Sequence, residues 1–277
     1  MLDTFLCRER TTLPAFNDMG VNDASMLPAV RSFLETKSKE KFFGIVQFNN
    51  THYPYQLSEK QFAQFIPAEK LSLNSYDNAL LEQDNLIRSY FALLSNLHLL
   101  DSTVIIFTAD HSEAFNEHGH SGHLQTLYQE DISVPLWMYF PPSFPKNKIQ
   151  TAAMNQTKNI SHLDLFPTIL SLFGIAQDSL LNLTPAGTSL FTPLAQERII
   201  PLFGMDMIDT KGIISDTIKY LVSLRGNKKV EEVYDLKNDP NEQHNLLGKL
   251  TLQEMQALHK KFFAAEELRF SYKTRLQ

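Results

Sequence analysis

Cysteine is almost absent from this sequence, since Cys7 is the only one among 277 residues. One cysteine cannot form an internal disulfide, and it excludes a zinc site built on several cysteines. It leaves the redox compartment undetermined. Because no partner motif surrounds Cys7, a catalytic thiol is the less favoured interpretation of this residue.

Positive charge and long apolar runs are also scarce. Lys and Arg number 25 against 31 Asp and Glu, which gives a formal net charge of -6. A nucleic-acid binder needs a basic footprint, so the charge balance argues against that class of protein. The longest apolar runs, such as Val104–Phe107 and Val134–Phe140, fall short of the roughly 20 residues of a membrane-spanning helix. Met1 precedes a charged segment and not the apolar core of a signal peptide. The sequence predicts neither a membrane span nor an export signal in these residues.

Apolar runs of strand length alternate with longer segments of helical period. This pattern is typical of an α/β protein in which helices flank a mostly parallel sheet. We expect strands at Phe42–Phe48, Thr103–Thr108 and Val134–Phe140. Thr103–Thr108 is β-branched and apolar throughout, which predicts burial on both faces of the strand. Pro135 favours an edge position for the last of the three.

Helices are predicted where apolar residues recur at three and four residue steps. The first is expected at Asp23–Leu34, with Asn22 or Asp23 as its N-cap, and the second at Asn78–Leu97. A third starts at Asp164 and ends before Gly174.

The last part of the chain has a different pattern of short apolar runs separated by polar turns. The runs are Ile199–Phe203, Lys219–Ser223 and Glu232–Asp235. A final helix follows, which starts with a Thr251-x-x-Glu254 capping box. We therefore predict an α/β domain over residues 1–195 and a small C-terminal subdomain over residues 196–277, an antiparallel sheet covered by a helix.

The densest group of potential metal ligands and proton carriers follows the Thr103–Thr108 run. Its members are Asp110, His111, Glu113, Glu117, His118, His120 and His123. Sites in open α/β sheets form at the carboxyl ends of strands, where loops carry the chemistry and strands hold it rigid. A solvated surface loop is the alternative for any single His, but four His in so short a stretch favour a site. His52 follows the Phe42–Phe48 run and can reach the same edge; its alternative is a turn His stacked between Tyr53 and Tyr55.

The segment Ile105–Pro135, IIFTADHSEAFNEHGHSGHLQTLYQEDISVP, resembles the sulfatase family of the alkaline phosphatase superfamily. Members of that family carry a strand, a Thr-Ser-Asp-His/Asn-Gly-Glu segment, a Gly-His/Lys pair and a Tyr-Glu-x-x-x-x-Val-Pro segment. Further stretches agree in the same order: Asn50–Pro54, Tyr76–Asp101, His162–Thr168, Gly187–Leu190 and Tyr234–Pro240. The resemblance covers nearly all of the chain from Gly20 onward. It implies an alkaline phosphatase-like fold and the hydrolysis of sulfate esters.

The resemblance implies a role for four residues. Asp110 and His111 match metal ligands, and His123 matches the Lys or His that contacts the transferred sulfate or phosphate. His52 matches the His that binds the anion or protonates the leaving oxygen. The implied cofactor is a divalent metal ion, Zn, Mn or Ca, and the imidazole of His111 favours Zn or Mn because calcium prefers oxygen ligands. A His at this position also resembles the membrane-anchored phosphoglycerol and phosphoethanolamine transferases, whereas the Tyr234–Pro240 turn is more typical of ester hydrolases.

One feature departs from the family pattern. The resemblance implies a strand with acidic ligands and a Cys, Ser or Thr nucleophile well before His52, yet only 51 residues precede it and none fits. We therefore expect an N-terminally incomplete part of a metal-dependent sulfuric ester hydrolase, inactive by itself, whose parent protein takes a sulfate or phosphate ester. The alternatives are part of a phosphoethanolamine or phosphoglycerol transferase, and an inactive anion-binding homologue. The resemblance also implies an extracytoplasmic location, in the periplasm or at the outer face of the inner membrane, with any membrane anchor in the missing N-terminal part.

Overall fold

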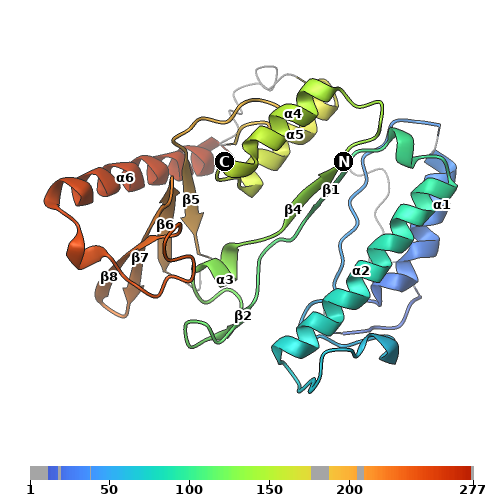
Figure 1. Ribbon diagram of the computed structural model, residues 1–277, viewed down its shortest axis with the longest axis horizontal. Coiled ribbons are helices and arrows are strands. Elements are labelled where there is room, and N and C mark those ends of the chain that lie inside the picture. The colour runs from blue at the N-terminus through green and yellow to red at the C-terminus, as the bar shows by residue number, and fades with distance from the viewer. Residues whose placement is uncertain (1–11, 18–19, 38, 176–186, 205–208, 276–277) are drawn as a thin grey trace. The chain divides into compact units, whose positions relative to one another are not determined.

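The computed structural model describes residues 12–17, 20–37, 39–175, 187–204 and 209–275 (Figure 1). They fall into two compact units, one within Met1–Ile105 and Pro141–Ser143, the other within Ile106–Phe140 and Phe144–Gln277. The predicted domain boundary at residues 195 and 196 stays a prediction. Cys7 lies outside the described residues.

The first unit is built on two helices that lie side by side in Figure 1, α1 (Leu27–Lys37) and α2 (Leu73–Asn96). Both predicted helices are confirmed. The second begins earlier than expected because the Ser72 hydroxyl accepts a hydrogen bond from the backbone N–H of Ser75 and caps the helix there. Leu34 and Leu93 are buried between the helices. The described residues of this unit also form the 3-10 turns η2 (Asp23–Met26), η3 (Lys60–Phe62) and η4 (Leu100–Ser102).

The predicted cap of the first helix is confirmed, but the strand predicted after that helix is wrong. The Asn22 side chain accepts a hydrogen bond from the N–H of Ala24 at the start of η2. Phe42–Phe48 contains no strand, and Ile45 is 77% exposed. An apolar run becomes a strand only where a neighbour supplies hydrogen-bond partners, and no strand of the described ranges pairs with it.

In the second unit, strand β1 (Ile105–Thr108) pairs with β4 (Leu136–Tyr139). Both strands lie where the sequence predicts strands. All four residues of β1 are half-buried, so the prediction of burial on both faces is wrong. The two short strands β2 (Ala114–Phe115) and β3 (Ser121–Gly122) form an antiparallel hairpin after β1.

Helices follow the hairpin and β4 along the chain. They are α3 (Gln129–Ile132), α4 (Lys146–Met154) and α5 (Leu165–Leu172), with the 3-10 turns η5 (Asn155–Thr157) and η6 (His162–Asp164). The helix predicted after Asp164 is confirmed as α5. Gly174, with a φ of 72°, ends it in the left-handed conformation that glycine adopts without strain.

The C-terminal part forms a four-stranded antiparallel sheet in the order β5-β6-β7-β8, which confirms the predicted subdomain architecture. Its strands are β5 (Ile199–Phe203), β6 (Thr210–Ser215), β7 (Ile218–Arg225) and β8 (Lys228–Asp235). Strand β6 is not among the predicted runs. After η8 (Leu247–Lys249), helix α6 (Leu252–Arg275) lies along the sheet in Figure 1.

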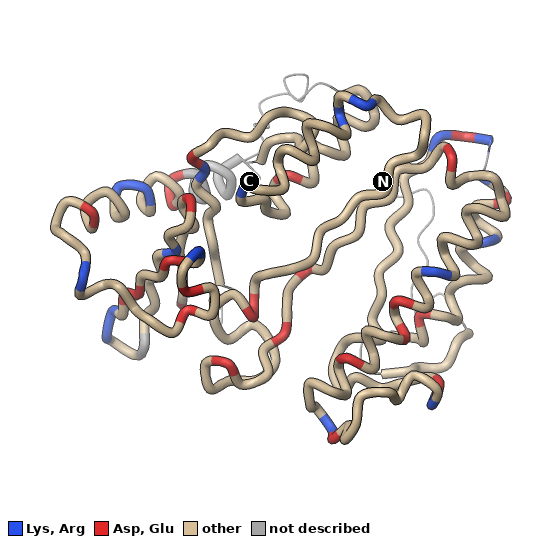
Figure 2. The backbone as a smooth tube through the Cα atoms, in the orientation of Figure 1, with Lys and Arg blue, Asp and Glu red and all other residues tan. Residues whose placement is uncertain are grey.

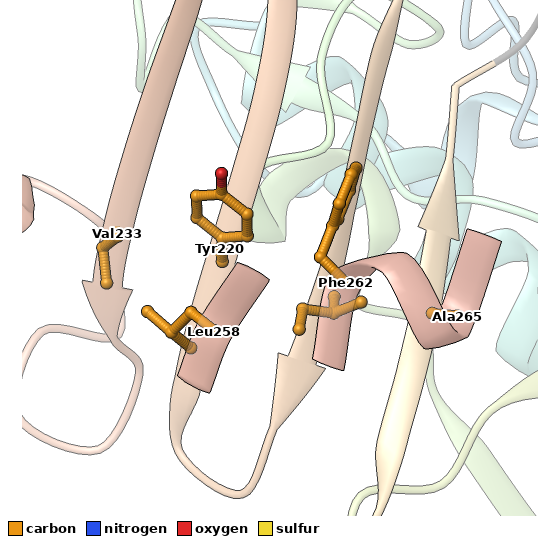
Figure 3. Close-up of a cluster of buried hydrophobic side chains, with 6 residues drawn as sticks. Tyr220, Val233, Leu258, Phe262 and Ala265 are labelled. Atoms are coloured by element: carbon orange, nitrogen blue, oxygen red, sulfur yellow. The ribbon is translucent and has the colours of Figure 1, made fainter. Parts of the chain in front are cut away.

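The core of this subdomain lies between the sheet and α6. Tyr220 and Val233 of the sheet pack against Leu258, Phe262 and Ala265 of the helix, as Figure 3 shows. The predicted capping box is present, since the Thr251 N–H donates to the Glu254 carboxylate and the Glu254 N–H to the Thr251 hydroxyl. Within the described ranges, no helix has the length and apolar character needed to cross a membrane.

Candidate active site

The β2–β3 hairpin places two candidate side chains next to each other. Ala114 pairs with Gly122 in the antiparallel register, so Glu113 and His123 lie one step beyond that pair on the two strands. Asn116 and Gly119 both have positive φ in the connecting turn, and the Asn116 N–H donates to the His120 carbonyl over 2.8 Å. The turn therefore fixes which carboxylate meets His123.

Glu113 holds His123 in one orientation. The His123 Nδ1 lies 2.9 Å from the Glu113 Oε1, and the Glu113 side chain is only 8% exposed. An ionised carboxylate can only accept, so Nδ1 carries a hydrogen. A substrate would therefore be contacted through the second ring nitrogen, Nε2.

His111 has the opposite ring nitrogen directed at Asp110. Its Nδ1 lies 2.9 Å from the Ser112 carbonyl oxygen, which can only accept, so Nδ1 carries the hydrogen here too. Its Nε2 lies 3.8 Å from the Asp110 Oδ2. The His111 and His123 rings stack with their centroids 4.0 Å apart and an interplanar angle of 28°. The structure thus brings Asp110, His111 and His123 together.

The Asp110 and His111 pair fits two ligands of one divalent ion. A neutral His111 presents a lone pair at Nε2 beside a carboxylate oxygen, and the Ser112 carbonyl fixes that tautomer as the outer partner of a metal-bound imidazole does. A nitrogen and an oxygen donor suit zinc or manganese. Across the described part of the chain no three His, Cys, Asp or Glu groups are arranged to hold an ion.

The other two His of the cluster contact helix α3. The His118 Nδ1 lies 2.5 Å from the Glu130 Oε1, and the His120 Nε2 lies 3.2 Å from the Asp131 Oδ1. His118 also stacks on Tyr128, with ring centroids 3.9 Å apart. Burial lowers the pKa of His118, but its hydrogen bonds to Glu130 and to the Glu242 carbonyl outweigh burial and raise the pKa above the ordinary value. His118 and His120 therefore brace the loop from within the protein.

The charge of the whole segment is negative. Ile106–Phe140 contains five Asp and Glu residues and no Lys or Arg, and its tube in Figure 2 carries red segments and no blue. Asp110 is 81% exposed at the surface of this segment. An anionic ester approaching Asp110 meets a repulsive field unless a cation is bound there.

His52 belongs to the first unit. Its N–H donates to the Asn49 carbonyl and its own carbonyl accepts from the Tyr55 N–H, both over 3.0 Å, so it lies in a tight turn. The His52 Nδ1 lies 3.0 Å from the Tyr53 carbonyl oxygen, which can only accept, so Nδ1 carries a hydrogen. Its meeting with the His123 group stays a prediction.

The structure contradicts the surface-loop alternative for three of the His residues and gives Glu113 a role in the candidate site. The solvated-loop reading is wrong for His118, His120 and His123, whose side chains are 10–19% exposed and each face a carboxylate. Glu113 is the added residue: the sequence places it in the cluster without a role. The signal was the Asn116 to Gly119 turn, which predicts a hairpin and therefore a cross-strand partner for His123.

Comparison with known proteins gives one family. Residues 3–175 match the family model described as Sulfatase. Arylsulfatase K of Xenopus laevis is 26% identical over 212 residues, which cover 72% of this chain and 38% of that protein. Lipoteichoic acid synthase 1 of Bacillus subtilis is 25% identical over 252 residues, which cover 88% of this chain and 37% of that protein. The chain thus spans less than two fifths of the length of these curated relatives.

The fold has solved counterparts. A protein of the alkaline phosphatase superfamily from Vibrio parahaemolyticus superposes with a TM-score of 0.59 and 19% identity, over 94% of this chain and 57% of that one. The predicted alkaline phosphatase-like α/β fold is confirmed by this likeness.

Proposed function

This chain belongs to the sulfatase family, and on that premise we propose that it contributes to a metal-dependent centre that hydrolyses sulfate esters. The observation that carries the proposal is the convergence of Asp110, His111 and His123 at the end of β1 in a segment without Lys or Arg. A cation bound in such a segment would offset the repulsion between its carboxylates and an anion. The match to arylsulfatase K supports a sulfate ester as the chemical class of the anion.

Asp110 and His111 would hold the divalent ion, Zn or Mn by the chemistry of the donors. When bound, the ion supplies positive charge at the oxygens of the transferring group. A protonated His123 donates from Nε2 to an oxygen of the ester while its Nδ1–H donates to Glu113, whose negative charge balances the imidazolium. On the resemblance we assign to His52 the protonation of the leaving oxygen, which requires an imidazolium that carries a hydrogen on Nε2.

A phosphoglycerol or phosphoethanolamine type of transfer is the second candidate. It is supported by the match to lipoteichoic acid synthase 1, which extends over 88% of this chain, and by the imidazole ligand His111. The same residues would then contact a phosphodiester. For either activity, we place the protein outside the cytoplasm, by likeness to these relatives, with a membrane anchor expected in a transferase.

Metal binding is the first test. Isothermal calorimetry with zinc chloride and manganese chloride on the 277-residue chain should show one ion bound, and Asp110→Asn should weaken binding by about tenfold or more. Asp101→Asn, an exposed Asp of η4, is the matched control and should bind as the unchanged chain does. Equal binding by Asp110→Asn would overturn the ligand assignment.

Turnover is the second test, made on the full-length natural protein with added metal. Release of nitrophenol from nitrophenyl sulfate that is lost in Asp110→Asn and in His123→Ala supports the hydrolase. Turnover of a bis(nitrophenyl) phosphate in place of the sulfate supports the transferase. Metal binding without turnover of either ester identifies an inactive anion-binding homologue and overturns the proposed activity.

A further inference from the structure

Glu242 is a fully buried residue where three parts of the second unit meet. Its carboxylate lies 2.8 Å from the Lys219 Nζ of β7 and accepts a hydrogen bond from the Gln129 N–H of α3 over 2.6 Å. Its backbone carbonyl accepts from the His118 Nε2 over 3.2 Å. Its φ of 53° is in the left-handed region, which is unusual for a glutamate. The backbone there is shaped so that one residue reaches the sheet, the short helix and the His loop together.

Helix α3, which Glu242 holds through Gln129, also contacts the loop that carries the candidate site. The Asp131 carbonyl accepts from the Ser112 N–H over 3.1 Å, and the Ser112 carbonyl is the partner of His111 Nδ1. The Asp131 carboxylate accepts from the Thr126 N–H over 2.9 Å and contacts His120. Hydrogen bonds joined by the backbone of α3 and of Ser112 therefore connect Glu242 to the ring of His111, on which His123 stacks.

Burying the ion pair of Lys219 and Glu242 costs free energy, because both charges lose their contact with water. Neither Lys219 nor Glu242 is exposed, and burial lowers the pKa of the Lys219 ammonium and raises the pKa of the Glu242 carboxyl. Apolar side chains of similar volume often stabilise a fold as well or better. Apolar contact is already provided, because Leu127 and Tyr128 pack on Leu221 and Tyr234. The apolar residues already hold this segment against the sheet. The ion pair therefore adds a fixed orientation of α3 relative to the sheet.

We propose that Glu242 is a positioning residue for His111 and His123: its buried pair with Lys219 fixes α3, and α3 fixes the rings. The inference deepens the proposed function, since it gives the turn after Asp239 and Pro240 a task in the candidate site. It links the C-terminal sheet to that site, because Lys219 of β7 pairs with Glu242, and Glu242 accepts from Gln129 and His118.

The test uses ring nitrogen shifts, which need neither metal nor activity. The 277-residue chain, labelled with nitrogen-15 histidine, is compared with Glu242→Gln and with Lys219→Met/Glu242→Gln. The double variant removes both charges together, so it keeps the test valid if the single variant leaves a buried cation and unfolds. Glu266→Gln is the matched control: Glu266 pairs with Lys211 at 3.0 Å between α6 and β6, away from the loop.

We expect His111 and His123 in the unchanged chain to show two resolved Nδ1–H tautomers. In both Glu242 variants these shifts should move toward the averaged values of a mobile imidazole, and zinc affinity should fall about tenfold, while Glu266→Gln changes neither. Ring shifts in a folded double variant that match those of Glu266→Gln would overturn the positioning role. A chain that binds no zinc, yet loses the tautomers in the Glu242 variants, would refute the proposed metal site and keep the positioning role.

Discussion

Cationic side chains face carboxylates in the second unit, whereas two buried carboxylates of the first unit are held mainly by backbone N–H groups. In the first unit, Asp23 accepts from the backbone N–H groups of Asn49 and Asn50, and Glu82 accepts from those of Ser58 and Glu59. In the second, Asp164 faces Arg198, Glu242 faces Lys219, and Glu130 faces His118. Backbone N–H groups do not titrate, whereas imidazoles change charge near neutral pH. The contact of His118 with Glu130 is therefore a pH-sensitive contact of the loop that carries the candidate site.

The largest expected effect is the loss of a buried ion pair in the second unit. The unexposed Asp164 carboxylate accepts from Arg198 Nη2 over 2.6 Å and Nη1 over 3.1 Å, and from the Thr188 and Ser161 N–H groups. Asp164→Ala leaves the guanidinium without its charge partner and should lower the free energy of unfolding by about 3–5 kcal/mol. Urea unfolding followed by circular dichroism measures it. Asp84→Ala, which removes an exposed pair with Arg88, should cost no more than about 0.5 kcal/mol; equal losses would show that burial does not decide the outcome.

The backbone-held carboxylate of the first unit should cost less to remove. Asp23→Ala leaves the N–H groups of Asn49 and Asn50 without their acceptor, for a loss of about 2–3 kcal/mol in the free energy of unfolding. Asp23→Asn keeps one acceptor oxygen and no charge. Burial is the main cause of the raised pKa of Asp23. Asp23→Asn should therefore lower the free energy of unfolding by no more than half of the loss expected for Asp23→Ala. A control as damaging as the alanine would mean that the charge, and not the acceptor, matters.

Periodicity predicted α1, α2, α5 and α6, because the signal for a helix lies within a few neighbouring residues, but α3 and α4 were not predicted. Strand pairing is not local, so Phe42–Phe48 was predicted as a strand that the described residues do not pair, and β6 was not predicted. Asp110, His111 and His123 were predicted from the resemblance, and the structure brings them together. The pair of Lys219 and Glu242 joins a strand to a distant turn, and nothing in either local pattern indicates the other residue.

Protonation of His118 should contribute more to the stability of the second unit at acid pH than at alkaline pH. Because its folded pKa is raised, the stabilisation is fully present below the unfolded value of about 6.5 and is lost as pH rises through the folded value. The groups that face the ring are Glu130, the Glu242 carbonyl, Tyr128 and Gln243. His118→Gln should cost about 1.5 kcal/mol at pH 5.5 and less at pH 8.5, by urea unfolding. His244→Gln, on an exposed side chain, is the control; a cost that grows with pH in His118→Gln would contradict the sign.

The smallest expected effect on stability concerns a carboxylate that is held by a backbone N–H at the protein surface. At the start of α6, the Glu254 carboxylate accepts from the Thr251 N–H over 2.8 Å, and the Thr251 hydroxyl accepts from the Glu254 N–H over 3.3 Å. Thr251→Ala removes the cap and should lower the free energy of unfolding by about 1 kcal/mol. Glu254→Gln keeps a side-chain oxygen that can accept the same N–H, so it should stay close to the unchanged chain. If Glu254→Gln were the more damaging change, charge would govern even this exposed contact, and the distinction between carboxylates held by N–H groups and by cations would fail at the surface.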